Sequence, residues 1–457
     1  MNKKMLVIFL LQVFILGGAA AYSADGPIGA VYVNQSTSAP EVSNVAAQVK
    51  NNISEKSQSL SLNSLIQEAL KNNPQITSAR WRYEAAKARI SLLRTVEDPR
   101  FEYEYDKITA DMDAVLRGKT GPMRTFAISQ SIPFPTKLFL RKKAAQKEAD
   151  SYRQEYIETG RKVIKDVKEA YFRLFLSSKK ITITRENLNL LGRFAETVNT
   201  RYSVGKANQQ DALKAQVESS KLSNQLVLLE QEEKIYETLL NSLLSRPPNG
   251  PLGLLQEKNS KAMEFEEEGI LKLTKDSRPE LKSYRDMLKK SAIELELAKQ
   301  EYLPDFMLKY RREERNGSAG PWAGMVGVTI PLWFLDKQNS FVREARANLE
   351  EAKAQYQAEE NVVLFEARSS YVKFEAAKNL VKIYETGILP QAQAALETAT
   401  LGYQSDKIGF LDLLDTLRTL WDFQMEYLES LANLEIALAD LERSVGIDIT
   451  QYQTGRT

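Results

Sequence analysis

The stretch Tyr403-Gln-Ser-Asp-Lys-Ile-Gly-Phe-Leu-Asp412-Leu-Leu-Asp415 decides the fold, because it separates two long helical patterns and has a counterpart much earlier in the chain. The counterpart is Tyr202-Ser-Val-Gly205-Lys206-Ala-Asn-Gln-Gln-Asp211-Ala-Leu, with Tyr, Lys and Asp in the same places. Each copy ends one helix and begins another, so each is predicted to be the tip of a helical hairpin. The tip residues are Tyr202, Gly205, Lys206 and Asp211 in the first copy and Tyr403, Asp406 and Lys407 in the second.

The segments before the tips also repeat, which indicates two tandem copies of one unit. Pro74 and Pro279 open matching helices, and a second proline, Pro99 or Pro304, follows each at the same distance. The repeats are predicted at residues 60–246 and 270–446. A linker at 247–269 joins them, and a C-terminal tail follows at 447–457.

Each repeat contains two segments in which apolar and polar residues alternate. In the first repeat, Phe101, Tyr103 and Tyr105 alternate with acidic residues, and residues 126–132 are predicted to form the strand that pairs with this segment. In the second, two such segments flank a predicted turn at Asn316-Gly317-Ser318. Alternation over about 10 residues is typical of a membrane strand with one lipid face and one watery face. A small soluble sheet would fit the same pattern.

The helical patterns predict long antiparallel coiled-coil hairpins. Mostly apolar residues in the last helix recur at alternating steps of four and three: Leu413, Leu417, Leu420, Gln424, Tyr427, Leu431, Leu434, Leu438, Leu441 and Val445. Such spacing specifies left-handed coiled-coil packing. The helix at about 137–202 would reach roughly 100 Å. Its counterpart at about 337–403 contains Gly387 and Pro390, where the proline removes a backbone hydrogen bond and is expected to bend the helix.

The N-terminus has the features of an exported protein. Residues 1–21 combine a basic start, an apolar run from Met5 to Ile15 and the small residues Ala19-Ala20-Ala21, which predicts a secretory signal peptide. A membrane anchor helix is the alternative, but the apolar run is shorter than the ~20 residues that a span needs. Residues 22–59 lack periodicity and are predicted to be an extended segment.

The composition argues against several classes of function. Lys and Arg (62) nearly balance Asp and Glu (60), so no nucleic-acid partner is expected. The chain has no His and no Cys, which removes imidazole and thiol as catalytic groups and metal ligands. We therefore expect no enzymatic activity, no cofactor and no metal site.

If the strands lie in a membrane, backbone hydrogen bonding predicts an oligomer. Four strands are too few to close a barrel, since the smallest single-chain barrels have about 8, and open sheet edges do not occur in lipid. Three copies would supply twelve strands. The expected fold is therefore mainly α with a small β part, in which four transmembrane strands per chain complete a 12-stranded barrel in a homotrimer.

At this point the chain resembles the TolC-like outer membrane efflux proteins over about residues 60–446. The resemblance rests on the tandem repeat, the paired prolines, the two tips, and the segments Gln130-Ser-Ile-Pro133-Phe-Pro and Thr329-Ile-Pro331-Leu-Trp-Phe-Leu-Asp336. These two segments are closest to the heavy-metal efflux branch. Two features depart from the family: no cysteine is present for lipid anchoring, and Asp406 stands where relatives usually have glycine.

The resemblance implies a channel in the outer membrane of a Gram-negative bacterium, in contact with its lipid and with a large periplasmic portion. Its partners would be a periplasmic adaptor and an inner-membrane efflux pump, of the RND type. Asp412 and Asp415, which share one helix face, align with the acidic rings at the periplasmic gate of such channels. The plain alternative is that both carboxylates stabilise a helix N-terminus, by about 0.3–1 kcal/mol. A bend at Gly387 and Pro390 would serve as the pivot for opening.

Two other classes of protein remain open from the residues alone. An exported coiled-coil structural or adhesive protein would also have long helices behind a signal peptide. A periplasmic adaptor would carry helical hairpins, although without strands in both copies of a repeat. Either would lack a channel.

Overall fold

The computed structural model describes residues 61–108, 116, 121–253, 255–256, 264–315 and 318–449. The predicted signal peptide, the N-terminal segment at 22–59, most of the C-terminal tail, and Asn316 and Gly317 of the predicted turn lie outside the described residues.

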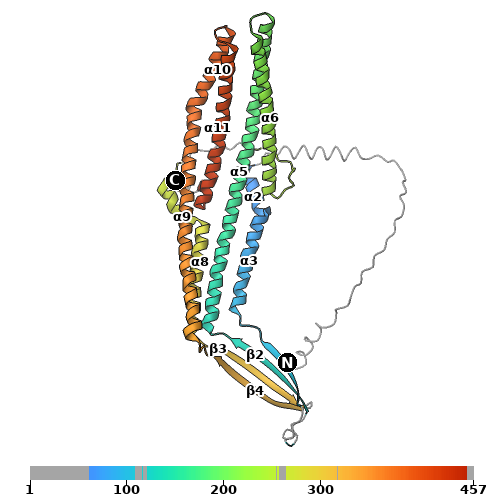
Figure 1. Cartoon of the computed structure of the whole chain (residues 1–457), viewed down its shortest axis with the longest axis vertical. Helices are drawn as coiled ribbons and strands as arrows, with labels where there is room; N and C mark the ends of the chain where they lie inside the picture. The colour runs from blue at the N-terminus through green and yellow to red at the C-terminus, as the bar shows by residue number, and fades with distance from the viewer. Residues whose placement is uncertain are drawn as a thin grey trace, which may run out of the picture. The chain divides into compact units, whose positions relative to one another are not determined.

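The order of elements occurs twice along the chain (Figure 1). The first half contains α2 (Leu62–Asn72), α3 (Pro74–Arg94), β1 (Arg100–Ile108), β2 (Gly121–Ile132), α5 (Pro135–Ser203) and α6 (Gln209–Leu243). The second half contains α7 (Glu267–Ser277), α8 (Pro279–Gln300), β3 (Asp305–Arg315), β4 (Ser318–Thr329), α9 (Asn339–Ile383), α10 (Leu389–Gln404) and α11 (Phe410–Val445). The mainly helical fold with a small sheet and two long hairpins agrees with the prediction.

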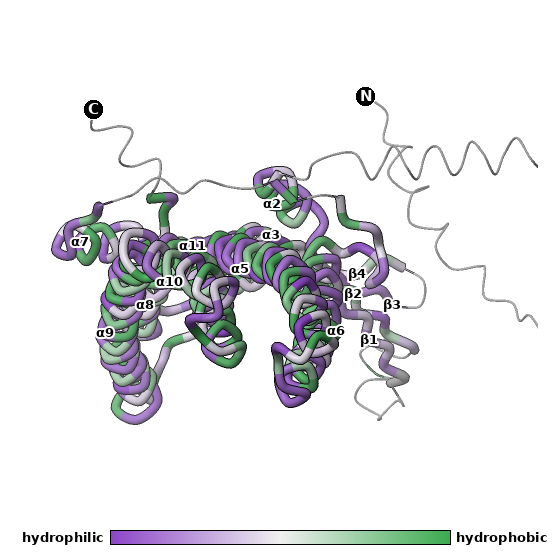
Figure 2. Tube along the Cα trace, turned by 90° about the horizontal axis from the view of Figure 1, so that it is seen from above, coloured by the Kyte–Doolittle hydropathy of each residue, from purple (hydrophilic) through white to green (hydrophobic). Residues whose placement is uncertain are grey.

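Helix α5 is the element against which most of the others pack. It has 69 residues, about 100 Å at roughly 1.5 Å per residue, and Pro135 stands at its first turn, where a missing N–H costs nothing. It contacts α3, α6, α8 and α11. The view from above in Figure 2 places α6 and α9 at the two ends of the row of helices. No helix in the described part of the chain combines the length and apolarity needed to cross a bilayer.

Residues with positive φ occur at equivalent helix ends in the two halves. The four described residues with positive φ form two pairs, Gly205 with Asp406 and Ser245 with Gly446, and both pairs have the same separation. The first pair ends the long helices in Schellman turns: Lys206 N donates to Arg201 O at 2.8 Å and Lys407 N to Gly402 O at 2.9 Å. Asp406, which stands where relatives usually have glycine, therefore adopts a left-handed conformation with φ of +55°.

Each returning helix ends against the junction of the two short helices in its own half. In the first half, Asn73 Nδ2 donates to Leu243 O at 3.0 Å. In the second, Arg278 Nη1 donates to Arg443 O at 2.6 Å. Both side chains donate to a carbonyl of the last helical turn, and Arg443 O also accepts from Gly446 N at 3.0 Å. Different residue types thus perform one task at equivalent places.

The four strands form one antiparallel sheet in the order β1-β2-β3-β4, so β1 and β4 are its edges. Register partners have side chains on the same face. One face carries exposed apolar residues: Phe101, Tyr103, Tyr105, Phe126, Ile128, Leu308, Tyr310, Trp322, Val326 and Val328. The other face carries charge, including a 2.6 Å ion pair between Glu102 and Lys309. The predicted alternation therefore produces a two-faced sheet.

A buried lysine fixes the sheet to the helices. The Lys137 side chain is 2% exposed and donates to Asp305 Oδ1 at 3.0 Å and to Leu303 O at 3.1 Å. Asp305 also accepts from Phe134 N at 2.9 Å. These bonds join the start of α5 to the start of β3, and so join the two halves where strands become helices.

Substituting Gly446 tests the close packing at the end of α11. Its φ is +83°, and an added Cβ would lie 2.9 Å from Arg278 Cα. We expect Gly446→Ala to cost about 1–3 kcal/mol from backbone conformation alone, with a further penalty from the contact. The measurement is the unfolding temperature of the purified protein.

Gly192→Ala is the matched control, because Gly192 lies inside α5 and a Cβ there would meet nothing within 4 Å. Alanine should stabilise that helix by roughly 0.5–1 kcal/mol. Equal effects of the two substitutions would contradict the packing described for Gly446.

Candidate functional site

The two acidic residues predicted to form a gate lie at the start of α11. Asp412 and Asp415 are exposed, whereas Leu413, Leu414 and Leu417 on the other side of the helix are buried. The carboxylates therefore share a free face, as their spacing predicted.

The two carboxylates differ in their local roles. Asp412 is the third residue of α11, and its Oδ2 accepts from Gly409 N at 3.3 Å, while Gly409 has no side chain for the reciprocal bond of a full capping box. Asp211 occupies the same place at the start of α6. Asp415 has no such local role, and the equivalent residue of the first repeat is Lys214. Helix capping thus accounts for Asp412, whereas Asp415 caps nothing and its charge acts on Arg418, one turn further along α11.

Arg201 joins the two tips, and sequence reasoning missed it. Its Nη1 forms an ion pair with Asp406 Oδ1 at 2.5 Å, and its Nη2 donates to Gln404 O at 3.1 Å. The guanidinium carbon lies 4.6 Å from the centre of the Tyr403 ring. One side chain of the first hairpin therefore contacts three residues of the second.

A signal for Arg201 was present in the comparison of the repeats. The residue equivalent to Arg201 in the second copy is Gly402, and the residue equivalent to Asp406 in the first is Gly205. At each of these two positions one copy has glycine and the other has a charged residue, and the two charges have opposite signs. Residues that break a repeat in complementary ways are candidates for contact.

The other predicted tip residues do not form a network with the acidic face. Lys206, Lys407 and Tyr202 are exposed, and in the described structure no bond joins either lysine to Asp412 or Asp415. Tyr403 is buried against Phe410, with ring centres 5.9 Å apart. Burial raises the pKa of the Tyr403 hydroxyl. The tips thus rest on an apolar cluster shared by both hairpins.

Further contacts between the hairpins follow along α5, α6 and α11. Arg418 of α11 pairs with the buried Glu218 of α6. This hydrogen bond holds the pKa of Glu218 below its ordinary value. Beyond it, Asn187 Nδ2 of α5 donates to Gln424 Oε1 at 3.3 Å, and Lys180 pairs with Glu429. Polar pairs therefore connect the hairpins at successive levels.

Gly387, one of the two residues predicted to bend the helix, lies in a π-helical turn, η2 (Tyr384–Ile388), between α9 and α10. Pro390 follows directly, at the second residue of α10. Two reciprocal bonds hold this turn to α11: Tyr384 Oη donates to Glu426 Oε2 at 2.6 Å and Tyr427 Oη to Glu385 Oε1 at 2.8 Å. Burial and the bond to Glu385 raise the pKa of Tyr427 to about 12. A second π turn, η1 (Phe334–Gln338), precedes α9.

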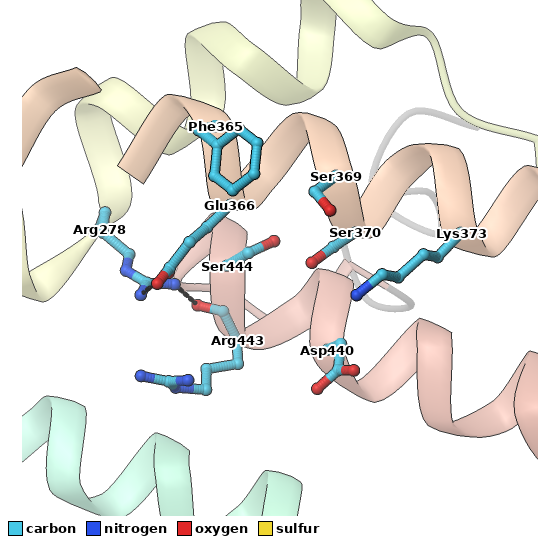
Figure 3. Close-up of a pocket in the computed structure, with 9 residues that line it drawn as sticks. All are labelled: Arg278, Phe365, Glu366, Ser369, Ser370, Lys373, Asp440, Arg443 and Ser444. Atoms are coloured by element: carbon cyan, nitrogen blue, oxygen red, sulfur yellow. Dashed lines mark hydrogen bonds and ion pairs between the residues drawn. The ribbon is translucent and has the colours of Figure 1, made fainter. Parts of the chain in front are cut away.

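A cavity of about 240 Å³ lies between α9 and α11, at the end of α11 remote from the tip (Figure 3). Arg278 faces it from a fully buried position and pairs with Glu280 at 2.6 Å and Glu366 at 2.8 Å. These bonds and the one to Arg443 O tie the guanidinium to the protein itself, which indicates a structural role. Among the described residues no group of three or more acidic side chains is placed to hold a metal ion.

Comparison with known proteins gives consistent matches. The family described as "Outer membrane efflux protein" matches residues 65–246 and 270–447. The cobalt-zinc-cadmium resistance protein CzcC of Cupriavidus metallidurans is 22% identical over 284 residues, which cover 61% of this chain and 66% of that protein.

Solved channels share the fold. The outer-membrane channel OprN gives a TM-score of 0.74 at 17% identity and covers 92% of this chain and 98% of its own. The CmeC outer membrane channel of Campylobacter jejuni gives a TM-score of 0.73 at 17% identity and covers 96% of this chain and 97% of its own. CusC gives 0.74 at 17% identity, covering 84% and 92%.

The Arg418–Glu218 contact predicts a specific dependence of stability on pH. The folded-state pKa of Glu218 is depressed. Its contribution to folding stability is therefore present above the unfolded-state pKa, about 4.3, and is lost as the pH falls through the folded-state pKa. We expect Glu218→Gln to flatten the acid side of the profile of unfolding temperature against pH.

Glu237→Gln on the same helix should act in the opposite sense. Burial raises the pKa of Glu237 in the folded protein. Its contribution to folding stability is therefore present at low pH and is lost as the pH rises through that folded-state pKa. The glutamine should therefore raise the unfolding temperature at neutral pH. Parallel shifts of both variants would rule out the stated pKa directions.

Proposed function

The chain belongs to the outer membrane efflux protein family, and we propose that it is the outer membrane channel of a tripartite efflux system. In this role it would conduct substrates from an inner-membrane pump and a periplasmic adaptor to the exterior. Residues 60–246 and 270–446 would be its two repeats, 247–269 their link and 447–457 the tail. Residues 1–21 would direct export, and 22–59 would form the N-terminal segment of the mature protein.

The observation that carries this proposal is the two-faced sheet with two open edges. The face with Phe101, Tyr103 and Tyr310 suits lipid, and the face with Glu102 and Lys309 suits water. In lipid the free edges of β1 and β4 would leave backbone groups unpaired. Pairing β4 of one copy with β1 of the next satisfies them, and three copies close a twelve-stranded barrel.

Exposed apolar residues on the outermost helices support the same assembly. Helix α6 exposes Leu213, Val217, Val227, Leu228, Ile235 and Leu239, and α9 exposes Phe341, Val362, Phe365, Val372 and Leu380. The two helices lie at opposite ends of the row in Figure 2. In a ring of copies, α6 of one chain would therefore pack near α9 of the next and cover these residues.

The tips would form the periplasmic gate. In a trimer, the faces bearing Asp412 and Asp415 would bring six carboxylates together around the entrance. Arg201 would hold the second tip to the first through Asp406, and η2 with Gly387 and Pro390 would allow the hairpin to bend. An exposed ion pair of this kind contributes no more than about 1 kcal/mol, so contact with an adaptor could rearrange it.

The cargo class that the relatives favour is divalent metal cations. CzcC is named for resistance to cobalt, zinc and cadmium, and the present chain spans about two thirds of the length of that protein. A conduit needs no tight metal ligands, because the pump would select the cargo. The family match favours this reading over an exported structural protein or an adaptor, and no catalytic role is proposed.

Expression in a bacterium that lacks its own outer membrane channel tests the proposal. With its adaptor and pump, the protein should restore growth in cobalt, zinc or cadmium, and detergent extraction should yield a trimer. A monomer that stays in the soluble fraction without detergent would exclude a channel. A trimer that restores drug resistance but not metal resistance would exclude only the cargo class.

Charge at the gate is tested by Asp415→Asn, which leaves the bond from Gly409 N to Asp412 Oδ2 intact. In planar bilayers, loss of three of the six carboxylates should weaken block by a divalent cation by roughly tenfold, about 1.4 kcal/mol. Asp412→Glu is the control, because glutamate retains both the charge and the capping geometry. Unchanged block in Asp415→Asn would remove Asp415 from the gate.

A further inference from the structure

An arginine that has no hydrogen bond or ion pair with any described residue interrupts the apolar face of the sheet. Arg312 of β3 is the register partner of Phe126 on β2 and of Trp322 on β4, and Tyr103 extends the same row as the partner of Phe126. Arg312 is exposed. Within the described part of the chain its guanidinium has no hydrogen bond or ion pair. A full positive charge thus lies between two aromatic side chains on an otherwise apolar surface.

The next row toward the strand ends carries a second exposed arginine. Arg124 of β2 is the register partner of Tyr105 on β1 and of Glu314 on β3. No ion pair joins Arg124 to Glu314 among the described residues. The aromatic rings around the two arginines pack in pairs, Tyr103 with Phe126 at 5.2 Å and Tyr310 with Trp322 at 6.2 Å. The pattern is two cations set in a belt of aromatic residues.

The place of these rows along the strands fixes which side of the membrane they face. The ends of the sheet nearest the helices are Ile132 and Asp305, and Arg124 and Arg312 lie near the opposite ends. This step rests on the proposed function, in which the helices are periplasmic and the opposite end faces the exterior. The penalty for an arginine on a lipid-facing strand is large at mid-membrane and nearly vanishes at the interface. The two arginines therefore mark the outer headgroup layer.

We propose that Arg312 and Arg124 bind phosphate groups of lipid headgroups in the outer leaflet, with the surrounding aromatic residues packing on the lipid. A guanidinium binds a phosphate through two parallel N–H···O bonds. Arg312 can form these bonds without breaking an ion pair to a described residue. Tyr and Trp are suited to the same depth, because one end of each ring system is polar. The partner is therefore a phosphorylated glycolipid or phospholipid, and its headgroup would fix the height of the barrel in the membrane.

The experiment measures lipid binding to the detergent-purified full-length protein by native mass spectrometry. The probes are diphosphorylated lipid A, the same lipid with its phosphates removed, and inorganic phosphate. The test variant is Arg312→Gln with Arg124→Gln. The control is Arg311→Gln, one residue away on the opposite face, where Arg311 pairs with Glu313 at 3.1 Å. Trimer formation and bilayer conductance are measured for all three proteins.

The wild type should bind the phosphorylated lipid, and the double variant should bind it roughly tenfold more weakly, with Arg311→Gln unchanged. Equal loss in the control, unaltered binding by the double variant, or equal binding of the dephosphorylated lipid would each overturn the proposal. Inorganic phosphate that competes at equal concentration would assign the site to a free anion. Any of these results with a conducting trimer leaves the proposed function standing, whereas a soluble wild-type monomer overturns both.

Discussion

The unpaired edges of the four-stranded sheet are the constraint on which the rest of the structure depends. Strands β1 and β4 are the edges of the sheet, and each presents a row of backbone N–H and C=O groups that no other strand of the described residues pairs with. In lipid, such groups can be satisfied only by other strands, so a single copy is incomplete as a membrane protein. The apolar face of the sheet and the exposed apolar residues of α6 and α9 are incomplete in the same sense, since each needs lipid or a second copy to cover it.

The two repeats share their backbone features and differ in the side chains through which they contact each other. Backbone features coincide in both halves, including the left-handed residues Gly205 and Asp406 and the capped ends of the returning helices. Side chains differ where the halves meet: Arg201 stands opposite Asp406, whereas both equivalent positions are glycine. Asp415 corresponds to Lys214. A ring of alternating, unlike hairpins can therefore form one kind of contact within a chain and another between chains.

Interactions change in character along the helices. Near the sheet and at the far ends of the hairpins, the charged side chains Lys137 and Arg278 are buried and bonded by several groups, so removing one partner would leave a buried charge uncompensated. At the tips Asp406 of the linking pair is exposed and Arg201 is half-buried, and such a partly exposed pair is individually weak. The π turn η2, which hydrogen bonds of Tyr384 and Tyr427 hold to α11, lies between these regions. A partner that docks at the tips can thus shift them while the remainder stays in place.

The sequence by itself determined the repeat, the helical hairpins, the strand pairs and the positions of both tips, because periodicity and turn residues are local signals that survive without tertiary context. It also determined that Asp412 and Asp415 share a face. Only the tertiary structure decided that Arg201 joins the tips and that Arg312 lies between Phe126 and Trp322. These facts depend on which segments meet and in which register. Contacts between residues hundreds of positions apart leave no periodic trace in the chain.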